Sequence, residues 1–503
     1  MEMFFRFLKN NQLTLSFIGS GFLLGSGFIY TLLWPLGLLG ITLFLFSITK
    51  CTSLKQAALG GWIALTVKAL CSLFFFWSSV PSLLINFPLG SSEPFIIAFY
   101  WLTISTSLGV AGVFLGGGLW SLFRFTIKYI WFLITPFLWL GSEVIGSLTY
   151  ALFVAGQGSS LSPVFSLGYV GYLLAEHPLL LQAANFGGVY ALSLLAVALA
   201  SLLLYLLLRS TARGEIKLAL ACGFAVALSL SAYLPWLTSE EGGDNFRVTI
   251  VDTRFGDALF YARENKEQYQ RSQLEEALRA ALSVGNQYVL LSEGSRLTGT
   301  ETNAAEAYKW FRFWYQDPSA VVIETGVYRN EDGERQVRTV VYDGVIKVGH
   351  AIDKHYLVPQ GEYMPYFFGT AIQLVAPEVL QEKMKNHLTF APAEVASQGN
   401  LPSHVPGILF CFSQKDALSV RTLTKERNVP FVVHPISHAW FHRPDSMWRQ
   451  YDAMLKVHAV WSGVAIVSAG NMTQGFLYLP NGRKITPTVL EIGESWTVSQ
   501  VAW

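Results

Sequence analysis

The sequence predicts a polytopic helical membrane domain of about seven spans, followed by an α/β sandwich domain outside the membrane. Of the 503 residues, 52% are hydrophobic and 14% are charged, whereas soluble proteins carry about 25% charged residues. The charge is also uneven, because 15 charged residues lie at positions 1–238 and 54 lie in the remaining 265. We therefore expect two domains, 1–238 and 245–503, separated by the polar stretch Ser239–Asp244. The net charge of +1 gives no reason to expect a nucleic-acid partner.

Seven segments of the first domain are apolar over about the 20 residues that a membrane-crossing helix needs. They are Leu13–Tyr30, Thr31–Ile48, Leu59–Val80, Phe95–Leu115, Tyr129–Val154, Ala183–Leu208 and Leu218–Trp236. The lysines and arginines between them form four clusters, which alternate with connections that lack basic residues. By the positive-inside rule these clusters face the cytoplasm, so the chain after Trp236 lies outside. In a bacterium with two membranes, this predicts an inner-membrane protein with a periplasmic second domain.

Two ionisable residues, Lys68 and Glu143, fall within the third and fifth predicted spans. A charge inside a bilayer is costly and usually faces a cavity or a partner. One interpretation is a polar site for a lipid headgroup. The other is a structural pair, or a lysine that extends to the interface, and the sequence leaves both open.

The second domain alternates strands with helices. Strand patterns occur at Phe246–Val251, Tyr288–Leu291, Ala320–Val327, Val337–Tyr342, Val345–His350, Gly407–Phe410, Pro430–Val433, Ala465–Ser468, Phe476–Leu479 and Thr497–Val501. Helical patterns occur at Glu264–Leu282, Ala305–Trp314, Asp416–Arg427 and Trp448–Val460. The dipeptide Asp343-Gly344 predicts a tight hairpin. Together these elements predict a layered sandwich of sheet and helices.

Cys411 is the one cysteine of the second domain, so it has no disulfide partner there. A lone thiol in an oxidising compartment is a liability unless it has a task or is deeply buried. Cys411 follows the apolar run Ile408–Phe410 and precedes a predicted helix, and a helix N-terminus lowers the pKa of a thiol. The sequence therefore offers Cys411 as a nucleophile, with a buried structural cysteine as the alternative.

Glu293 and Lys354 could complete a catalytic site around this thiol. Glu293 ends the strand that begins at Tyr288, and Lys354 follows the predicted hairpin. A carboxylate base, a cation and a thiol are the groups that acyl transfer through a thioester requires. Spacing along the chain does not show that the three converge.

Two motifs connect these residues with a known family. Lys354–Pro365 closely matches the pattern Lys-x-x-Leu-Val-Pro-x-Gly-Glu-x-x-Pro, and Gln182–Ser193 looks like Gln-x-Ala-x-x-x-Gly-Val-Tyr-Gly-x-Ser. With Glu293 and Cys411 in the same chain order, the sequence resembles the apolipoprotein N-acyltransferases. These are the membrane-bound members of the nitrilase (carbon–nitrogen hydrolase) superfamily. Trp139–Glu143 resembles the Trp-x-x-x-Glu segment of the same family.

The resemblance implies a nitrilase-like αββα sandwich and assigns a role to each chemical group. Glu293 would be the general base, Lys354 the catalytic lysine and Cys411 the nucleophile. Glu362 would be an auxiliary carboxylate. The backbone N–H of Phe412 would hold the oxyanion together with Lys354.

The resemblance also implies the substrates. An acyl chain of a phospholipid would move to Cys411, and then to the N-terminal amine of a diacylglyceryl-cysteine apolipoprotein. We expect a membrane-embedded monomer that needs no metal or organic cofactor. Mobile apolar loops around Met364–Phe368 would form the entrance, where Tyr363 and Tyr366 would contact acyl chains or serve ordinary packing.

The chain departs from the family beside the nucleophile. Phe412-Ser413 follows Cys411 where the family has Tyr-Glu, and Ser437-His438 stands where it has Asn-Asp. The chain also ends in strand-like sequence where the family has a last transmembrane helix. Two alternatives therefore stay open. One is an enzyme with the same triad and another acyl acceptor or an amide substrate, and the other is a catalytically inactive paralogue that binds lipoproteins.

Two further patterns carry less weight. His434, His438 and His442 are spaced like metal ligands on a helix, but Pro435 and the preceding apolar run favour a strand and loop. Gly116–Gly118 lacks the lysine and hydroxyl residue that a phosphate loop needs, so we interpret it as the end of a span.

Overall fold

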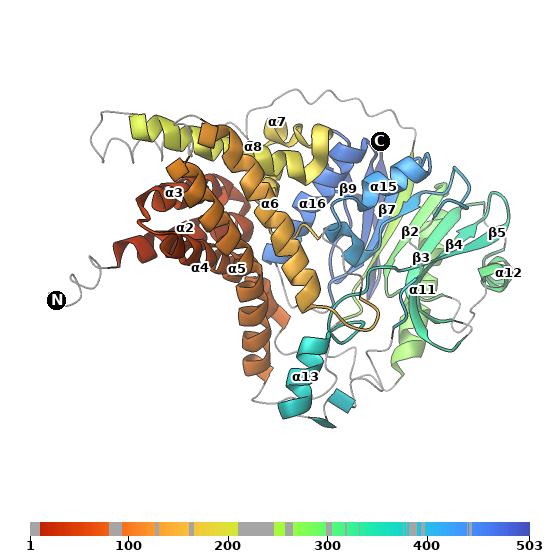
Figure 1. The fold of residues 1–503 in the computed structure, drawn as a ribbon. Coiled ribbons are helices and arrows are strands. Elements are labelled where there is room, and N and C mark those ends of the chain that lie inside the picture. The colour runs from red at the N-terminus through yellow and green to blue at the C-terminus, as the bar shows by residue number, and fades with distance from the viewer. Residues whose placement is uncertain are drawn as a thin grey trace.

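The computed structural model places a helical half beside a half built around a large sheet (Figure 1). It describes residues 11–79, 93–125, 130–159, 165–209, 246–256, 265–297, 304–316, 319–330, 332–375, 377–378, 380–381, 390–393, 398–439, 441 and 445–503. The predicted seventh span, Leu218–Trp236, and the predicted boundary, Ser239–Asp244, lie outside these residues.

Six apolar helices form most of the helical half. They are α2 (Gln12–Ile29), α3 (Trp34–Lys50), α4 (Leu54–Ser72), α5 (Glu93–Phe125), α6 (Ile130–Phe153) and α8 (Ala184–Arg209), with the short α7 (Pro178–Leu181) before α8. Within the described part of the chain, five helical stretches are long and apolar enough to cross a membrane, and α3 is shorter. The second predicted span was expected to begin at Thr31. The residues Thr31–Leu33 instead form a 3-10 turn, and α3 begins at Trp34 with Pro35 in its first turn.

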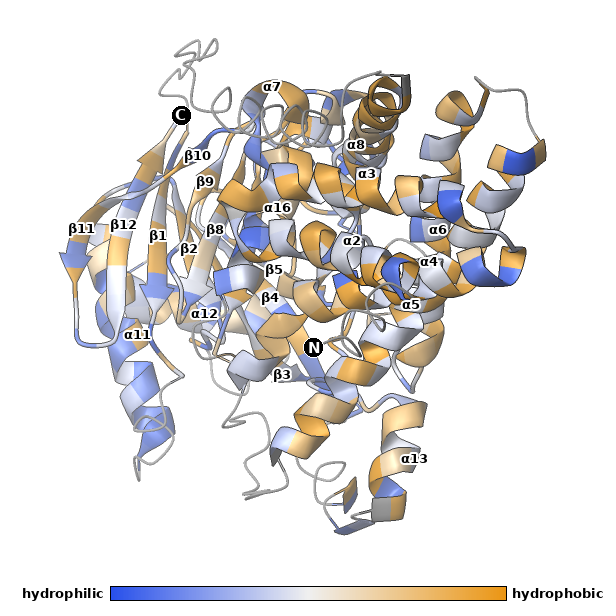
Figure 2. Ribbon diagram, turned by 90° about the vertical axis from the view of Figure 1, so that its left-hand side faces the viewer, coloured by the Kyte–Doolittle hydropathy of each residue, from blue (hydrophilic) through white to orange (hydrophobic). Residues whose placement is uncertain are grey.

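Glycines allow α4 and α5 to touch backbone to backbone. A Cβ atom on Gly61 would lie 2.0 Å from the carbonyl oxygen of Gly112, and a Cβ on Gly112 would meet Gly61 as closely. Small residues at helix contacts are typical of membrane bundles, because close van der Waals packing, and not the hydrophobic effect, holds helices together in lipid. Figure 2 shows that apolar residues dominate this half, whereas hydrophilic residues gather on the outer helix α11 (Lys266–Ser283).

The strands of the second half form one curled sheet of twelve strands. They are β1 (Arg247–Thr253), β2 (Tyr288–Glu293), β3 (Val321–Arg329), β4 (Arg335–Asp343), β5 (Val348–Asp353), β6 (Gly407–Ile408), β7 (Val432–Ser437), β8 (Ile466–Asn471), β9 (Leu477–Tyr478), β10 (Lys484–Ile485), β11 (Thr488–Ile492) and β12 (Trp496–Ala502). One wing contains β11, β12 and β1 to β5, and the other contains β6 to β10. The wings join where Thr253 of β1 pairs with Asn471 of β8.

Alternate residues of each strand face different layers, as the pleat of a strand requires. Ile250 and Leu290 of the first wing share a buried cluster with Val433 and Val467 of the second wing. Val251, the neighbour of Ile250, faces the other way, into a cluster with α11 and α12 (Ala304–Tyr315). The helices α15 (Ser419–Glu426) and α16 (Asp445–Ser462) cover the second wing. The layers are therefore helix, sheet, sheet and helix, as the sequence predicted.

The hairpin at Asp343 is wider than the sequence predicted. Asp343 pairs with Val348, so four residues form the turn and the return strand begins at Val348, not at Val345. The Asp343 carboxylate accepts hydrogen bonds from the backbone N–H groups of Val345, at 3.0 Å, and Ile346, at 3.2 Å. The Asp343 side chain therefore stabilises a four-residue turn in place of the expected two-residue turn.

The helix α16 connects the two halves. It packs against α8 and α2 on one side and belongs to the sandwich on the other, and Figure 1 shows it between the bundle and the sheet. Its residue Trp461 fits against Gly188, where α8 has non-helical backbone. Gly188 has φ +58°, and a Cβ there would lie 2.2 Å from the Trp461 ring. Only glycine fits at this contact.

Candidate active site

The predicted catalytic residues converge at the ends of strands. Glu293 is the last residue of β2, Lys354 directly follows β5, and Cys411 opens the five-residue 3-10 helix Cys411–Lys415 after β6. All three line one cavity of about 420 Å³, together with Glu362. The convergence that spacing could not show is therefore present in the structure.

Lys354 lies between two carboxylates. Its Nζ atom is 2.7 Å from Oε1 of Glu362 and 3.7 Å from Oε1 of Glu293. The second oxygen of Glu362 accepts a hydrogen bond of 2.8 Å from the backbone N–H of Val358. The backbone of Lys354 is also fixed, because its N–H donates to Val337 at 2.8 Å. The ammonium group is thus held in one position beside the thiol.

The Cys411 thiol is in hydrogen-bonding contact with the Glu293 carboxylate. Burial and the nearby Glu293 raise the pKa of Cys411 to about 12, against the opposing effects of Lys354 and the backbone N–H of Ser437. The sequence predicted a pKa lowered by a helix N-terminus, and that prediction is wrong. The helix is a single short 3-10 turn, and burial next to a carboxylate outweighs it. At rest the sulfur is therefore a thiol that needs a base.

Glu293 is placed to be that base. Burial raises the pKa of its carboxyl group, and Lys354 opposes this shift. Burial alone would lower the pKa of Lys354, but Glu362 and Glu293 raise it above its usual value. Lys354 therefore stays a cation, while Glu293 has the raised basicity that proton transfer from a thiol requires.

The opposite wall of the cavity belongs to the helical half. Its apolar side chains include Leu73, Phe75, Ile97, Tyr100, Ile104 and Val154. One wall thus carries a thiol, a carboxylate and a cation, and the other wall is suited to hydrocarbon. This arrangement can hold an apolar chain with its carbonyl group at Cys411.

The structure places the other predicted residues of the site as follows. Phe412 lines the cavity, and its ring lies 5.5 Å from that of Phe165. Tyr363 is buried, and its hydroxyl donates a 2.8 Å hydrogen bond to the carbonyl of Val154. Tyr366 is 66% exposed and does not line the cavity.

The expected entrance loop is in part a helix. The helix α13 (Tyr366–Val375) begins within the segment Met364–Phe368. Phe368 is fully buried, and its ring lies 4.4 Å from that of Tyr100 on α5. The prediction of apolar loops is corrected there, because aromatic side chains pack the start of α13 against α5 and α6.

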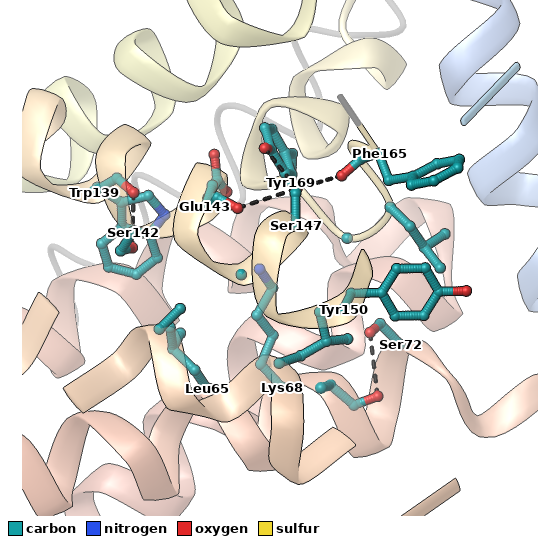
Figure 3. Close-up of a pocket in the computed structure, with 16 residues that line it drawn as sticks. Leu65, Lys68, Ser72, Trp139, Ser142, Glu143, Ser147, Tyr150, Phe165 and Tyr169 are labelled. Carbon is teal, nitrogen blue, oxygen red and sulfur yellow. Dashed lines mark hydrogen bonds between the residues drawn. The ribbon is translucent and has the colours of Figure 1, made fainter. Parts of the chain in front are cut away.

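Lys68 and Glu143 line a different cavity, of about 60 Å³, inside the helical half. Figure 3 shows Lys68 reaching from α4 toward the turn of α6 that carries Glu143. One oxygen of Glu143 accepts a hydrogen bond of 2.7 Å from the backbone N–H of Val170. Tyr150 and Leu167 line both cavities, so the two are neighbours. Lys68 and Glu143 themselves do not line the catalytic cavity.

Lys415 and His438 also line the catalytic cavity, and neither was assigned a role there from the sequence. Lys415 ends the 3-10 helix that Cys411 begins, and His438 follows β7. The His438 ring stacks on Trp448 at 5.3 Å, and neither ring nitrogen has a hydrogen-bond partner among the described residues. Burial lowers the pKa of His438 to about 3, so the ring is neutral. A signal was available for Lys415, because it lies only four residues after the nucleophile.

Of the three patterned histidines, His434 lies in a strand as expected, His438 follows that strand, and His442 lies outside the described residues. His434 lies in β7, and its Nδ1 atom is 2.8 Å from the carbonyl oxygen of Leu409. No group of His, Cys, Asp and Glu able to hold a metal ion occurs among the residues that the structure describes.

The comparison with solved structures finds partial matches to carbon–nitrogen hydrolases. A carbon-nitrogen hydrolase from Helicobacter pylori G27 has 12% identity and a TM-score of 0.34, covering 51% of this chain and 88% of that one. A cysteine-to-alanine mutant of an amidase from Nesterenkonia AN1, of the nitrilase superfamily, has 16% identity and a TM-score of 0.35, covering 51% and 90%. No model of a protein family matches the chain, and no curated protein sequence does. These similarities are too distant to assign a family.

Proposed function

We propose that this chain is a membrane-bound cysteine acyltransferase. In this proposal it transfers an acyl chain from a phospholipid to the N-terminal amine of a diacylglyceryl-cysteine apolipoprotein, through a thioester on Cys411. The main support is the cavity with Glu293, Lys354 and Cys411 on one wall and apolar side chains of membrane helices on the other. The resemblance of the Lys354–Pro365 and Gln182–Ser193 motifs suggests the acceptor.

In the first step Glu293 takes the thiol proton of Cys411. The sulfur attacks the ester carbonyl carbon of the phospholipid, and the negative charge that develops on the carbonyl oxygen is stabilised by Lys354 and the N–H of Phe412. The carbon–oxygen bond then breaks. The leaving alkoxide takes the proton back from Glu293 and departs as a lysophospholipid, which leaves an acyl thioester on Cys411.

In the second step the acceptor amine attacks the thioester carbonyl. Glu293 takes a proton from the amine as the new carbon–nitrogen bond forms. The carbon–sulfur bond breaks, and the proton returns to the Cys411 thiolate. Both substrates are lipids, which gives a physical reason to build the cavity from membrane helices and a catalytic domain together.

Intact-mass analysis of the purified full-length protein tests the first step. After incubation with phospholipid, the protein should gain one acyl mass, and hydroxylamine should remove it because it cleaves thioesters. The variant Cys411→Ser should gain no hydroxylamine-sensitive mass. Absence of the adduct from the folded wild type with several phospholipids would argue against the proposal.

A second candidate is an enzyme with the same triad and another acceptor or an amide substrate. The neutral His438 and the Ser413 beside the nucleophile favour it, because they change the surroundings in which an acceptor amine would bind. Mass spectrometry of lipoprotein N-termini in a deletion strain separates the two. Loss of N-acylation supports the first candidate, and unchanged N-acylation supports the second.

A further inference from the structure

Lys415 is a buried cation inside the catalytic cavity. It is the last residue of the 3-10 helix that begins with Cys411, and it is 9% exposed. Its carbonyl oxygen accepts hydrogen bonds from the backbone N–H of Ser166, at 2.8 Å, and from the Ser166 hydroxyl, at 3.1 Å. A loop of the helical half therefore fixes the backbone of Lys415, and its side chain lines the cavity.

Among the described residues, no carboxylate lies within 4.0 Å of the Lys415 ammonium group. That group lies instead over two aromatic rings, 4.3 Å from the centre of Phe412 and 5.5 Å from that of Tyr451. Aromatic faces attract a cation, but they do not neutralise its charge. Lys354, in the same cavity, differs because its ammonium group contacts two carboxylates.

A buried charge is costly unless an opposite charge compensates it. Among the described residues, Lys354 has that compensation and Lys415 does not. Burial lowers the pKa of Lys415 to about 8, so most of the protein still carries this charge at neutral pH. The missing anion would then come from the molecule that occupies the cavity.

We propose that Lys415 binds the phosphate group of the acyl donor, an inference that rests on the proposed function. In a phospholipid the phosphodiester and the ester carbonyls are joined through the same glycerol unit. A cation one helical turn from the nucleophile therefore fits a phosphate bound while the carbonyl lies at Cys411. The two aromatic rings hold the ammonium group in place, and lysine binds phosphate as a compact point charge.

Protection of Cys411 from alkylation tests phosphate binding without requiring acyl transfer. The full-length protein in neutral detergent is treated with iodoacetamide, and alkylation at Cys411 is followed by peptide mass spectrometry. Dodecyl phosphate should protect the wild type and Lys415→Arg. It should protect Lys415→Met only at a concentration at least tenfold higher.

Two controls sharpen this experiment. Lys425→Met makes the same change at an exposed position of α15 and should be protected like the wild type. Dodecanol, which lacks the phosphate, should not distinguish Lys415→Met from the wild type. Equal protection of Lys415→Met and the wild type by dodecyl phosphate would overturn the proposal. Inorganic phosphate that protects as well as dodecyl phosphate would overturn the assignment to a lipid.

Acylation kinetics supply the second test. For Lys415→Met, the ratio of kcat/KM for phospholipid to kcat/KM for the neutral ester p-nitrophenyl palmitate should fall at least tenfold, mainly through KM. An equal fall with both donors would mean that Lys415 acts on the thiol or the oxyanion, which overturns the proposal. Protection by dodecyl phosphate in a wild type that no phospholipid acylates would leave the phosphate site intact and refute the proposed function.

Discussion

The chain has two neighbouring cavities that each contain a lysine and a glutamate, and they differ in what surrounds those charges. The catalytic cavity holds Lys354 with two carboxylates and a thiol in about 420 Å³. The cavity inside the helical half holds Lys68 and Glu143 in about 60 Å³. Tyr150 and Leu167 belong to both walls.

The difference teaches that a buried lysine and glutamate do not make an active site by themselves. Glu143 already accepts a hydrogen bond from the backbone of Val170, which is a structural use of a carboxylate. The smaller cavity has room for a few water molecules and none for a lipid chain. Glu293, in contrast, contacts the thiol of Cys411 in a cavity that extends to apolar helices.

The largest expected effect is on catalysis. Glu293→Gln keeps the size of the side chain and removes the base, so acylation of Cys411 should slow by about 10²- to 10⁴-fold, the range that general bases contribute. Intact-mass measurements at timed intervals check this. A rate within threefold of the wild type would mean that another group removes the thiol proton.

The next effect is on stability. Lys354→Met leaves Glu293 and Glu362 buried without their cation, and breaking such a pair costs about 3–5 kcal/mol. Thermal unfolding of the protein in detergent should show a much lower midpoint. The double variant Lys354→Met with Glu362→Gln should recover part of the stability and none of the acylation. Recovery of acylation would contradict the role given to Lys354.

The third effect concerns pH. Because burial and Glu293 raise the pKa of Cys411 to about 12, the reactive thiolate should increase through the whole range from pH 7 to 10. Alkylation of Cys411 by a small neutral reagent should therefore accelerate about tenfold per pH unit, without the plateau that an ordinary thiol reaches near its pKa of about 8.5. Peptide mass spectrometry separates this cysteine from the others. A plateau of the alkylation rate below pH 9 would show that the pKa of Cys411 is not raised as the structure indicates.

The sequence predicted the three chemical groups because Glu293 ends a recognisable strand, Lys354 follows the predicted hairpin and Cys411 follows an apolar run. It could not predict their convergence, since distances between strand ends depend on how the two wings of the sheet close. It missed Lys415 because a lysine directly before a predicted helix usually faces solvent, and the 3-10 helix Cys411–Lys415 directs this one into the cavity. It also missed β10 and β11. The strand β10 has two residues, and every residue of β11 is exposed, so neither has the buried alternation that marks a strand.

The smallest expected effect is in the small cavity. Glu143→Gln keeps an oxygen that can accept from the N–H of Val170, so the free energy of unfolding should fall by less than about 0.5–1.5 kcal/mol, the net value of a whole hydrogen bond. The acylation rate should stay within twofold of the wild type. If Glu143→Gln instead slowed acylation as much as Glu293→Gln, the two cavities would have to be regarded as one functional site.

The contact between Gly188 and Trp461 affects whether the sheet half can be produced as a separate fragment. The catalytic groups belong to the sheet, but the apolar wall opposite them and the glycine that receives Trp461 belong to the helical bundle. A fragment cut out as a water-soluble catalytic module would therefore expose α16 and open the cavity on one side. Each half therefore depends on the other. A chimera that takes one half from a related protein would have to keep both the Gly188–Trp461 contact and the apolar wall of the cavity.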